Sequence, residues 1–127
     1  MSEHIGKLLL RLMLGGMMLF HGVNKVLYGI DFIKGLIHGQ GLPEILAYGV
    51  YVGEILAPLF IVIGWKIRIW AGVLVVNMVG AIYLTQMGAL WKLGAHGAWA
   101  VEVPMFYLLT ALALFFLGSG KYAVNRD

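Results

Sequence analysis

The amino-acid sequence predicts an all-α integral membrane protein, a four-helix bundle formed by one domain over residues 1–127. Of these 127 residues, 61% are hydrophobic and 12% are charged, and that charged fraction is about half of what a typical soluble domain carries. Two stretches, residues 69–91 and 103–120, contain no Lys, Arg, Asp or Glu, and a helix of roughly 20 apolar residues crosses a hydrocarbon core. The composition argues against a soluble enzyme, which would have too little polar surface.

Four membrane spans are expected, at residues 8–27, 45–63, 67–87 and 103–118. The first has charges only near its ends, at Arg11 and Lys25, where long side chains can extend to the interface. No small-residue cleavage pattern follows it, so we expect a retained span and not a signal peptide. The second span carries Glu54 near its middle. The long loop between them has apolar residues at helical spacing, so a short interfacial helix is expected there, beginning near Asp31.

The distribution of Lys and Arg predicts that both termini lie in the cytoplasm. Six of the nine basic residues belong to the N-terminus, the turn between the second and third spans, and the C-terminal tail, and three belong to the two other loops. Loops richer in Lys and Arg stay on the inner side of a membrane. The net charge of +3, without a basic run, gives no sign of a nucleic-acid partner, so the lipid bilayer is the expected environment.

Polar side chains inside the spans are the candidate functional residues, because each costs energy in lipid unless it is paired or faces a cavity. At about 1.5 Å per residue, Glu54 lies roughly 15 Å from the inner end of its span, and Asn77 reaches a similar depth in the third span. His21 lies somewhat higher and Lys25 near the outer interface, while Glu102 opens the fourth span on that side. These side chains are therefore expected to converge in the outer half of the bundle.

One face of the first span is expected to pack against another helix. Arg11 and Lys25 lie within roughly 40° of each other around this helix, with His21 about 40° further round. Gly15 and Gly22 lie close to this polar stripe, and small residues allow helices to approach closely. His21 then has two interpretations, a hydrogen bond between helices or a place in a proton or ligand site.

Glu54 is the most informative single residue. Pro58 follows it by four residues, so the proline ring should clash with the Glu54 carbonyl, kink the span there and leave a free backbone acceptor. In one interpretation Glu54 forms an ion pair with Lys25 or Arg11, or is protonated and bonded to Asn77. In the other it is a proton-exchanging carboxyl at a small polar cavity. The sequence leaves both interpretations open.

Cofactor chemistry is constrained by the residue types that the chain lacks. It has no cysteine, which excludes a disulfide framework, a thiolate nucleophile and a Cys-ligated iron–sulfur cluster. Haem is not predicted, because His21 has no second buried histidine with which to form a pair of axial ligands. No metal site is predicted either: His21, Glu54 and Glu102 are suitable ligand types, but their spacing is not diagnostic.

The order and spacing of these motifs resemble the DoxX family over essentially the whole chain. The matching residues are Arg11-xxx-Gly15, His21-Gly22-xx-Lys25, Glu54, Gly64 with the basic turn Lys66 and Arg68, Glu102, and the closing Gly118-Ser119-Gly120-Lys121-Tyr122. The resemblance implies a small four-span inner-membrane protein, often associated with redox systems. Related DoxD-type subunits belong to thiosulfate:quinone oxidoreductase, which passes electrons from thiosulfate to membrane quinone, while eukaryotic relatives act as cargo receptors or receptor-assembly chaperones.

The preferred functional hypothesis is a quinone-linked, oxidoreductase-associated subunit, as the resemblance implies. His21 and Glu54 are then the catalytic candidates, the first as a hydrogen-bond partner of the quinone and the second as a proton donor. The ligand-binding candidates are Arg11, Lys25, Asn77 and Glu102. Lys25 or Arg11 would attract an anionic substrate or keep Glu54 ionised.

The alternative hypothesis is a non-catalytic membrane module: an assembly factor, a chaperone, or a lipid- or small-molecule-binding protein. The same polar cluster would then specify how the helices pack. Under both hypotheses the chain is expected to form a homo-oligomer or to join a membrane or redox complex.

Overall fold

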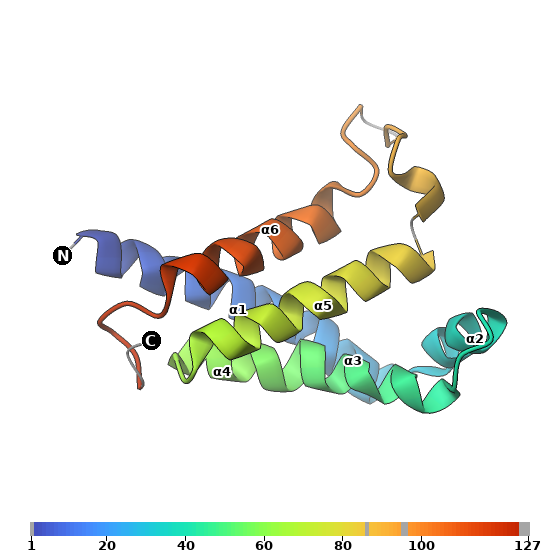
Figure 1. Cartoon of the computed structure of the whole chain (residues 1–127), viewed down its shortest axis with the longest axis horizontal. Coiled ribbons are helices and arrows are strands. Elements are labelled where there is room, and N and C mark those ends of the chain that lie inside the picture. The colour runs from blue at the N-terminus through green and yellow to red at the C-terminus, as the bar shows by residue number, and fades with distance from the viewer. Residues whose placement is uncertain (1, 86, 95–96, 125–127) are drawn as a thin grey trace.

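The computed structural model describes residues 2–85, 87–94 and 97–124, and every long element within them is a helix (Figure 1). Four helical segments form the bundle. They are α1 (Ser2–Tyr28), the continuous run of η1 (Glu44–Tyr48), α3 (Gly49–Tyr51), η2 (Val52–Leu56) and α4 (Ala57–Ile63), then α5 (Ile67–Thr85), and α6 (Glu102–Leu117). The short helices α2 (Asp31–Gly39) and η3 (Met87–Ala89) lie in the connections. The predicted all-α fold class is confirmed.

The helices pack around one main core that lies toward the end of the bundle holding the N-terminus. α5 packs against α6 and α4, and α1 packs against α4 (Figure 1). Small residues such as Ala71 and Ala111 are fully buried at these contacts, where they let the helices approach closely. The buried members of the core are Leu14, Met18, Ile61, Ile67, Ala71, Leu74, Met78, Ala111 and Leu114. Toward the opposite end, the space between the helices widens into cavities.

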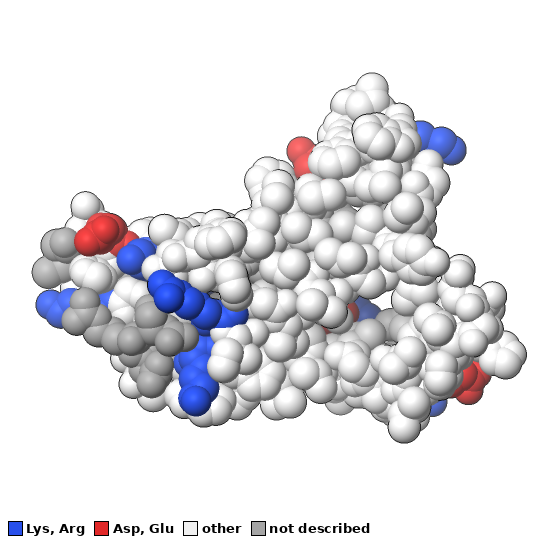
Figure 2. All heavy atoms as spheres, viewed as in Figure 1, with Lys and Arg blue, Asp and Glu red and all other residues white. Residues whose placement is uncertain are grey.

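The outer surface of the bundle has the character of a membrane protein. Three segments are long and apolar enough to cross a membrane, Ser2–Tyr28, Glu44–Ile63 and Ile67–Leu84, whereas the apolar helix α6 is shorter, with 16 residues. Large apolar side chains point outward along the helices, including Phe20 and Phe116, which are 79% and 71% exposed. Figure 2 shows that Lys, Arg, Asp and Glu gather toward the two ends of the molecule on the face drawn. An apolar belt of this extent is compatible with lipid and not with water.

The turn after α4 brings the two ends of the chain together. Gly64 has φ +78, a left-handed conformation that ends α4 and that glycine adopts without strain. A Cβ at this position would lie 2.7 Å from Nη2 of Arg11 and 2.5 Å from the Cβ of Ala123. Nearby, the backbone N–H of Lys121 donates to Nδ1 of His4 at 3.0 Å. The start of α1 and the segment after α6 therefore lie at the same end of the bundle.

The expected short helix after the first span is confirmed, because α2 begins at Asp31. Buried Ile30 and Ile37 pack against Ala47, which anchors α2 on the start of the second helical segment. Gly29 and Gly41 flank it with φ values of +82 and +76, and these left-handed residues reverse the chain at both ends. α2 therefore lies beside the start of the second helical segment and the end of α5 that holds Leu84.

Candidate functional site

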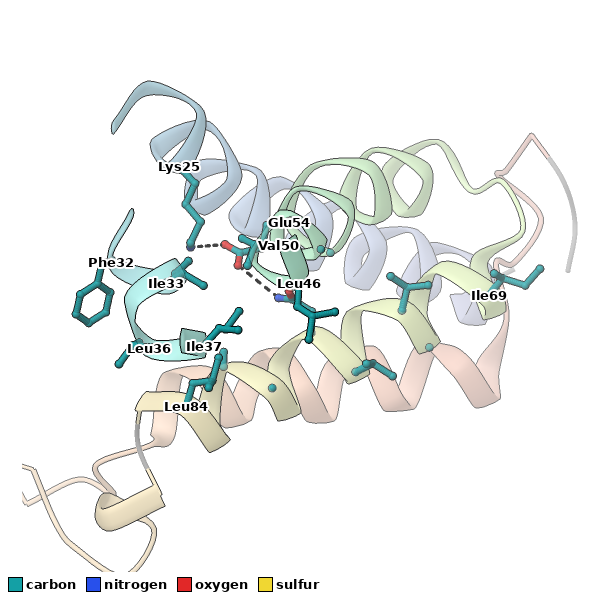
Figure 3. Close-up of a pocket in the computed structure, with 18 residues that line it drawn as sticks. Lys25, Phe32, Ile33, Leu36, Ile37, Leu46, Val50, Glu54, Ile69 and Leu84 are labelled. Carbon is teal, nitrogen blue, oxygen red and sulfur yellow. Dashed lines mark hydrogen bonds and ion pairs between the residues drawn. The ribbon is translucent and has the colours of Figure 1, made fainter. Parts of the chain in front are cut away.

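The three polar side chains at the centre of the site come from three different helices. Nζ of Lys25 in α1 donates to Oε1 of Glu54 in η2 at 2.6 Å, and Nδ2 of Asn77 in α5 lies 3.4 Å from Oε2 of the same carboxyl (Figure 3). The Glu54 side chain is 8% exposed and that of Lys25 is 23% exposed. Of the partners considered for Glu54, the structure brings together Lys25 and Asn77. We call these three residues the polar cluster.

A π-helical turn positions the Glu54 carboxyl. η2 occupies Val52–Leu56, and the backbone N–H of Ala57 donates to the carbonyl of Val52, five residues back. The next residue, Pro58, has no N–H to donate and cannot continue the regular α-helical pattern. The predicted distortion of the span at Glu54 is confirmed, and its form is a π turn. π turns inside α-helices frequently occur at functional sites.

Gly22 allows α1 to contact the backbone of this π turn. A Cβ at Gly22 would overlap the carbonyl oxygen of Glu54 and lie 2.7 Å from Cγ1 of Ile55. About two turns earlier in α1, a Cβ at Gly15 would lie 2.7 Å from the carbonyl oxygen of Pro58. The glycine side of the first span therefore packs against the second helical segment, as its small residues predict. This close approach is what brings Lys25 within reach of Glu54.

Replacing Gly22 with Ala should destabilise the bundle, although alanine is the better helix former. The added methyl would force α1 away from Glu54, and overpacking of this kind costs about 1–3 kcal/mol. The measurement is thermal unfolding in detergent. Gly16→Ala is the matched control, because a Cβ there meets nothing within 4 Å, and it should be neutral or stabilising by about 0.5–1 kcal/mol. Equal melting temperatures for the two variants would contradict the close contact.

A cavity of about 840 Å³ lies between the second helical segment and α5 beneath α2 (Figure 3). Its wall along α5 is one helical face that runs from Ile69 to Leu84. Exposed apolar side chains on that face, Ile69 at 58% and Val76 at 72%, show that the cavity opens on the apolar flank of the molecule. The polar cluster is its only polar lining among the described residues. We call this cavity the lateral groove.

A second cavity, about 310 Å³, lies on the other side of the ion pair, between α1, α5 and α6. Lys25 and Glu54 line it as well as the lateral groove. His21 lines only this second cavity, where its ring meets that of Tyr107 edge-on, with centroids 5.5 Å apart. The structure therefore separates two residues that the sequence placed at one site: Glu54 faces both cavities and His21 faces one.

Arg11 and Glu102, the other expected ligand-binding residues, do not join the polar cluster. The Arg11 side chain donates to the carbonyl oxygens of Ile61, Val62, Ser119 and Tyr122 at 2.6–3.1 Å. Glu102 is exposed in the first turn of α6 and lines neither cavity. Within residues 2–85, 87–94 and 97–124, no three His, Asp or Glu side chains converge as metal ligands do.

Two features of the site were missed by the sequence interpretation. One is Tyr107, which forms the α6 wall of the second cavity beside His21. The other is the lateral groove, for which a signal exists in the sequence: small residues recur on the lining face of α5 at Gly72, Gly80 and Ala81. Small side chains at helical spacing indicate either a close helix neighbour or an open channel, and only the arrangement of the helices distinguishes these cases.

Comparison with known proteins places the chain in a family. It matches the DoxX family model over residues 6–87. "Uncharacterized membrane protein Rv3486" of Mycobacterium tuberculosis (strain ATCC 25618 / H37Rv) is 29% identical over 126 residues, covering 92% of this chain and 77% of that protein. "Putative oxidoreductase CatD" of Bacillus subtilis (strain 168) is 28% identical over 124 residues, covering 98% of this chain and 87% of that protein. No solved structure matches at a significant level. Because the family model covers more than half of the chain, the protein belongs to the DoxX family.

Proposed function

We propose that this chain is the quinone-binding membrane subunit of an oxidoreductase complex. The observation that carries the proposal is the lateral groove, an apolar cavity of about 840 Å³ with a single polar cluster in its wall. A membrane quinone has the matching form, because it combines one polar ring with a long apolar tail. Opening on the apolar flank of the bundle, the groove would admit such a molecule directly from the bilayer.

The polar cluster supplies the groups that a quinone ring needs. Nζ of Lys25 and Nδ2 of Asn77 are hydrogen-bond donors for carbonyl oxygens, and both side chains line the groove. The Glu54 carboxyl can accept or deliver a proton beside them. The apolar face of α5 between Ile69 and Leu84 extends over about 22 Å at 1.5 Å per residue, which gives a tail of several isoprene units a surface on which to lie.

Electrons would reach the groove from a partner protein. This chain has no cysteine, so it has no thiolate with which to carry electrons or hold an iron–sulfur cluster. The relative with the name "Putative oxidoreductase CatD" supports a redox setting for a chain of this family. The proposal therefore includes a complex with a redox subunit, or a homo-oligomer that docks one.

The proposal also includes the inner membrane, four crossings and cytoplasmic termini. The beginning of α1 and the segment after α6 lie at the same end of the bundle, joined by the contact of Lys121 with His4. An even number of crossings produces this arrangement, and α6 supplies the fourth. Lys and Arg are more frequent in the N-terminus, the turn after α4 and the C-terminal tail than in the other loops. This excess supports the placement of that end of the bundle on the cytoplasmic side.

Filling the groove at Gly80 tests the proposal. Purified wild-type protein, extracted with organic solvent, should yield quinone in near-stoichiometric amount. Gly80→Leu should lose most of it, because Gly80 lines the groove and a side chain there enters open space. A steric penalty of about 1–3 kcal/mol corresponds to a loss of affinity of roughly 5- to 150-fold.

The matched control is Gly16→Leu, since a Cβ at Gly16 also meets nothing within 4 Å but lines neither cavity. It should retain quinone as the wild type does. Equal retention by both variants would place the quinone elsewhere on the protein. Recovery of phospholipid alone from the wild type would instead support the non-catalytic lipid-binding module.

A further inference from the structure

We propose that the second cavity is the proton route to the quinone site and that His21 carries the protons through it. This inference rests on the proposed function, because it assigns the source of the protons that a quinone in the lateral groove takes up. Reduction of a quinone to a quinol consumes two electrons and two protons. The electrons come from the redox partner, and the protons must arrive from water by another path.

The wall of the lateral groove contains no other titratable side chain among the described residues. Apart from the polar cluster it is lined by Gly, Ala, Val, Ile, Leu and Phe. Lys25 can give a proton to a quinone oxygen, and the Glu54 carboxylate can pass on a proton that it has first accepted, so both depend on a supply of protons at every turnover. Any group that reprotonates them must approach from a side other than the groove.

The second cavity provides that side. It shares Lys25 and Glu54 with the lateral groove, so the ion pair forms the partition between the two spaces. Its volume of about 310 Å³ is large enough to hold water, and the Lys25 and Glu54 side chains provide polar partners for it. His21 lines the cavity together with Val103 and Pro104 of the first turn of α6. The cavity therefore lies near the end of the bundle at which α6 begins. In this proposal water enters from that end, and the imidazole exchanges protons with it and with the ion pair.

The groups that face His21 are few and come from three elements. Lys25 lies on α1, Glu54 on η2 and Tyr107 on α6. The residues that α5 contributes to this cavity, Met78, Ala81 and Ile82, are not titratable. The edge-on ring of Tyr107, at 89° to the imidazole, holds His21 against the cavity wall. In the assigned step, the His21 imidazolium gives its proton through cavity water to the Glu54 carboxylate and is reprotonated from outside.

The test is single-turnover reduction of the bound quinone in lipid nanodiscs, with saturating dithionite as electron donor and the ultraviolet band of the quinone as signal. The His21→Ala variant should retain its quinone, but dithionite should reduce that quinone at least several-fold more slowly than in the wild type. Added imidazole, which fits the vacated space, should restore the rate. His21→Gln, which keeps the size of the side chain without a basic nitrogen, should also be slow. The control is His38→Ala, whose exposed histidine lies outside both cavities.

Three outcomes would overturn the inference and leave the proposed function standing. They are a wild-type rate in His21→Ala, a slow rate that imidazole does not restore, and loss of the quinone itself on substitution of His21. The last would make His21 a quinone ligand. A wild-type protein that yields no quinone would overturn both the inference and the proposed function. Restoration by imidazole with unchanged quinone content supports the proton route specifically.

Discussion

Replacing Lys25 with Met is expected to lower the free energy of unfolding by about 3–5 kcal/mol. The substitution leaves the Glu54 carboxyl, with its side chain 8% exposed, without its partner at 2.6 Å. Asn77 remains as a single neutral donor at 3.4 Å, which does not balance a buried negative charge. The variant should therefore unfold in detergent at a much lower denaturant concentration than the wild type.

The double variant Lys25→Met with Glu54→Gln distinguishes the effect of the unpaired charge on stability from the effect of altered packing. It removes both ions, so most of the lost stability should return, because two neutral side chains of similar size occupy the same space. Quinone retention should not return, since the Lys25 donor and the Glu54 carboxyl are both absent. A double variant as unstable as Lys25→Met alone would mean that packing, and not the unpaired carboxylate, causes the loss.

Arg11→Met should destabilise the bundle to a similar degree, by about 3–5 kcal/mol. Arg11 is 1% exposed, and its guanidinium donates to two carbonyls at the end of α4 and two in the segment after α6. The last carbonyls of a helix have no intrahelical partner, and hydrogen bonds to a charged donor each contribute about 1.5–3 kcal/mol. Met fills the space but removes the charged donor that all four carbonyls share.

Chemical unfolding of Arg11→Met, Arg11→Lys and Lys92→Met would test this assignment. Arg11→Lys keeps the positive charge but not the planar fork of donors, so it should lie between the wild type and Arg11→Met. Lys92→Met removes an exposed cation from the loop before α6 and should change stability by less than about 0.5 kcal/mol. The Arg11 variants should retain quinone when folded, and a folded Arg11→Met without quinone would give Arg11 a role in binding.

The fold class and the meeting of the three residues of the polar cluster could be predicted from the sequence. Apolar stretches long enough to cross a membrane predict the helices. Polar residues expected in the outer half of the bundle predict that Glu54, Lys25 and Asn77 converge. The position of Pro58 predicts a distorted backbone at Glu54, and the glycines of the first span predict its close approach to another helix. Each of these inferences depends on the local helical repeat, which the bilayer keeps regular because every backbone group must be satisfied within its own helix.

The partners of Arg11 could not be found in the same way. Its angular position on the helix agrees with that of Lys25, but 14 residues at 1.5 Å each separate the two by roughly 21 Å along the axis. The carbonyls of Ser119 and Tyr122, which it contacts, are 108 and 111 residues away in the sequence. Such contacts depend on how the chain closes after its last helix. The division of the site into two cavities likewise depends on the distances between helices. The positions of residues around one helix do not determine these distances.

The opening of the lateral groove on the apolar flank has a consequence for how occupancy is measured. A ligand that enters through Val76 and its neighbours partitions first into hydrocarbon, so the concentration that matters is its mole fraction in that phase and not its amount per litre of water. Adding detergent micelles enlarges the phase and dilutes the ligand, and the groove then empties although the intrinsic affinity is unchanged. Titrations at fixed ligand-to-protein ratio should shift with the amount of lipid or detergent, and affinities become comparable only when expressed per mole of amphiphile.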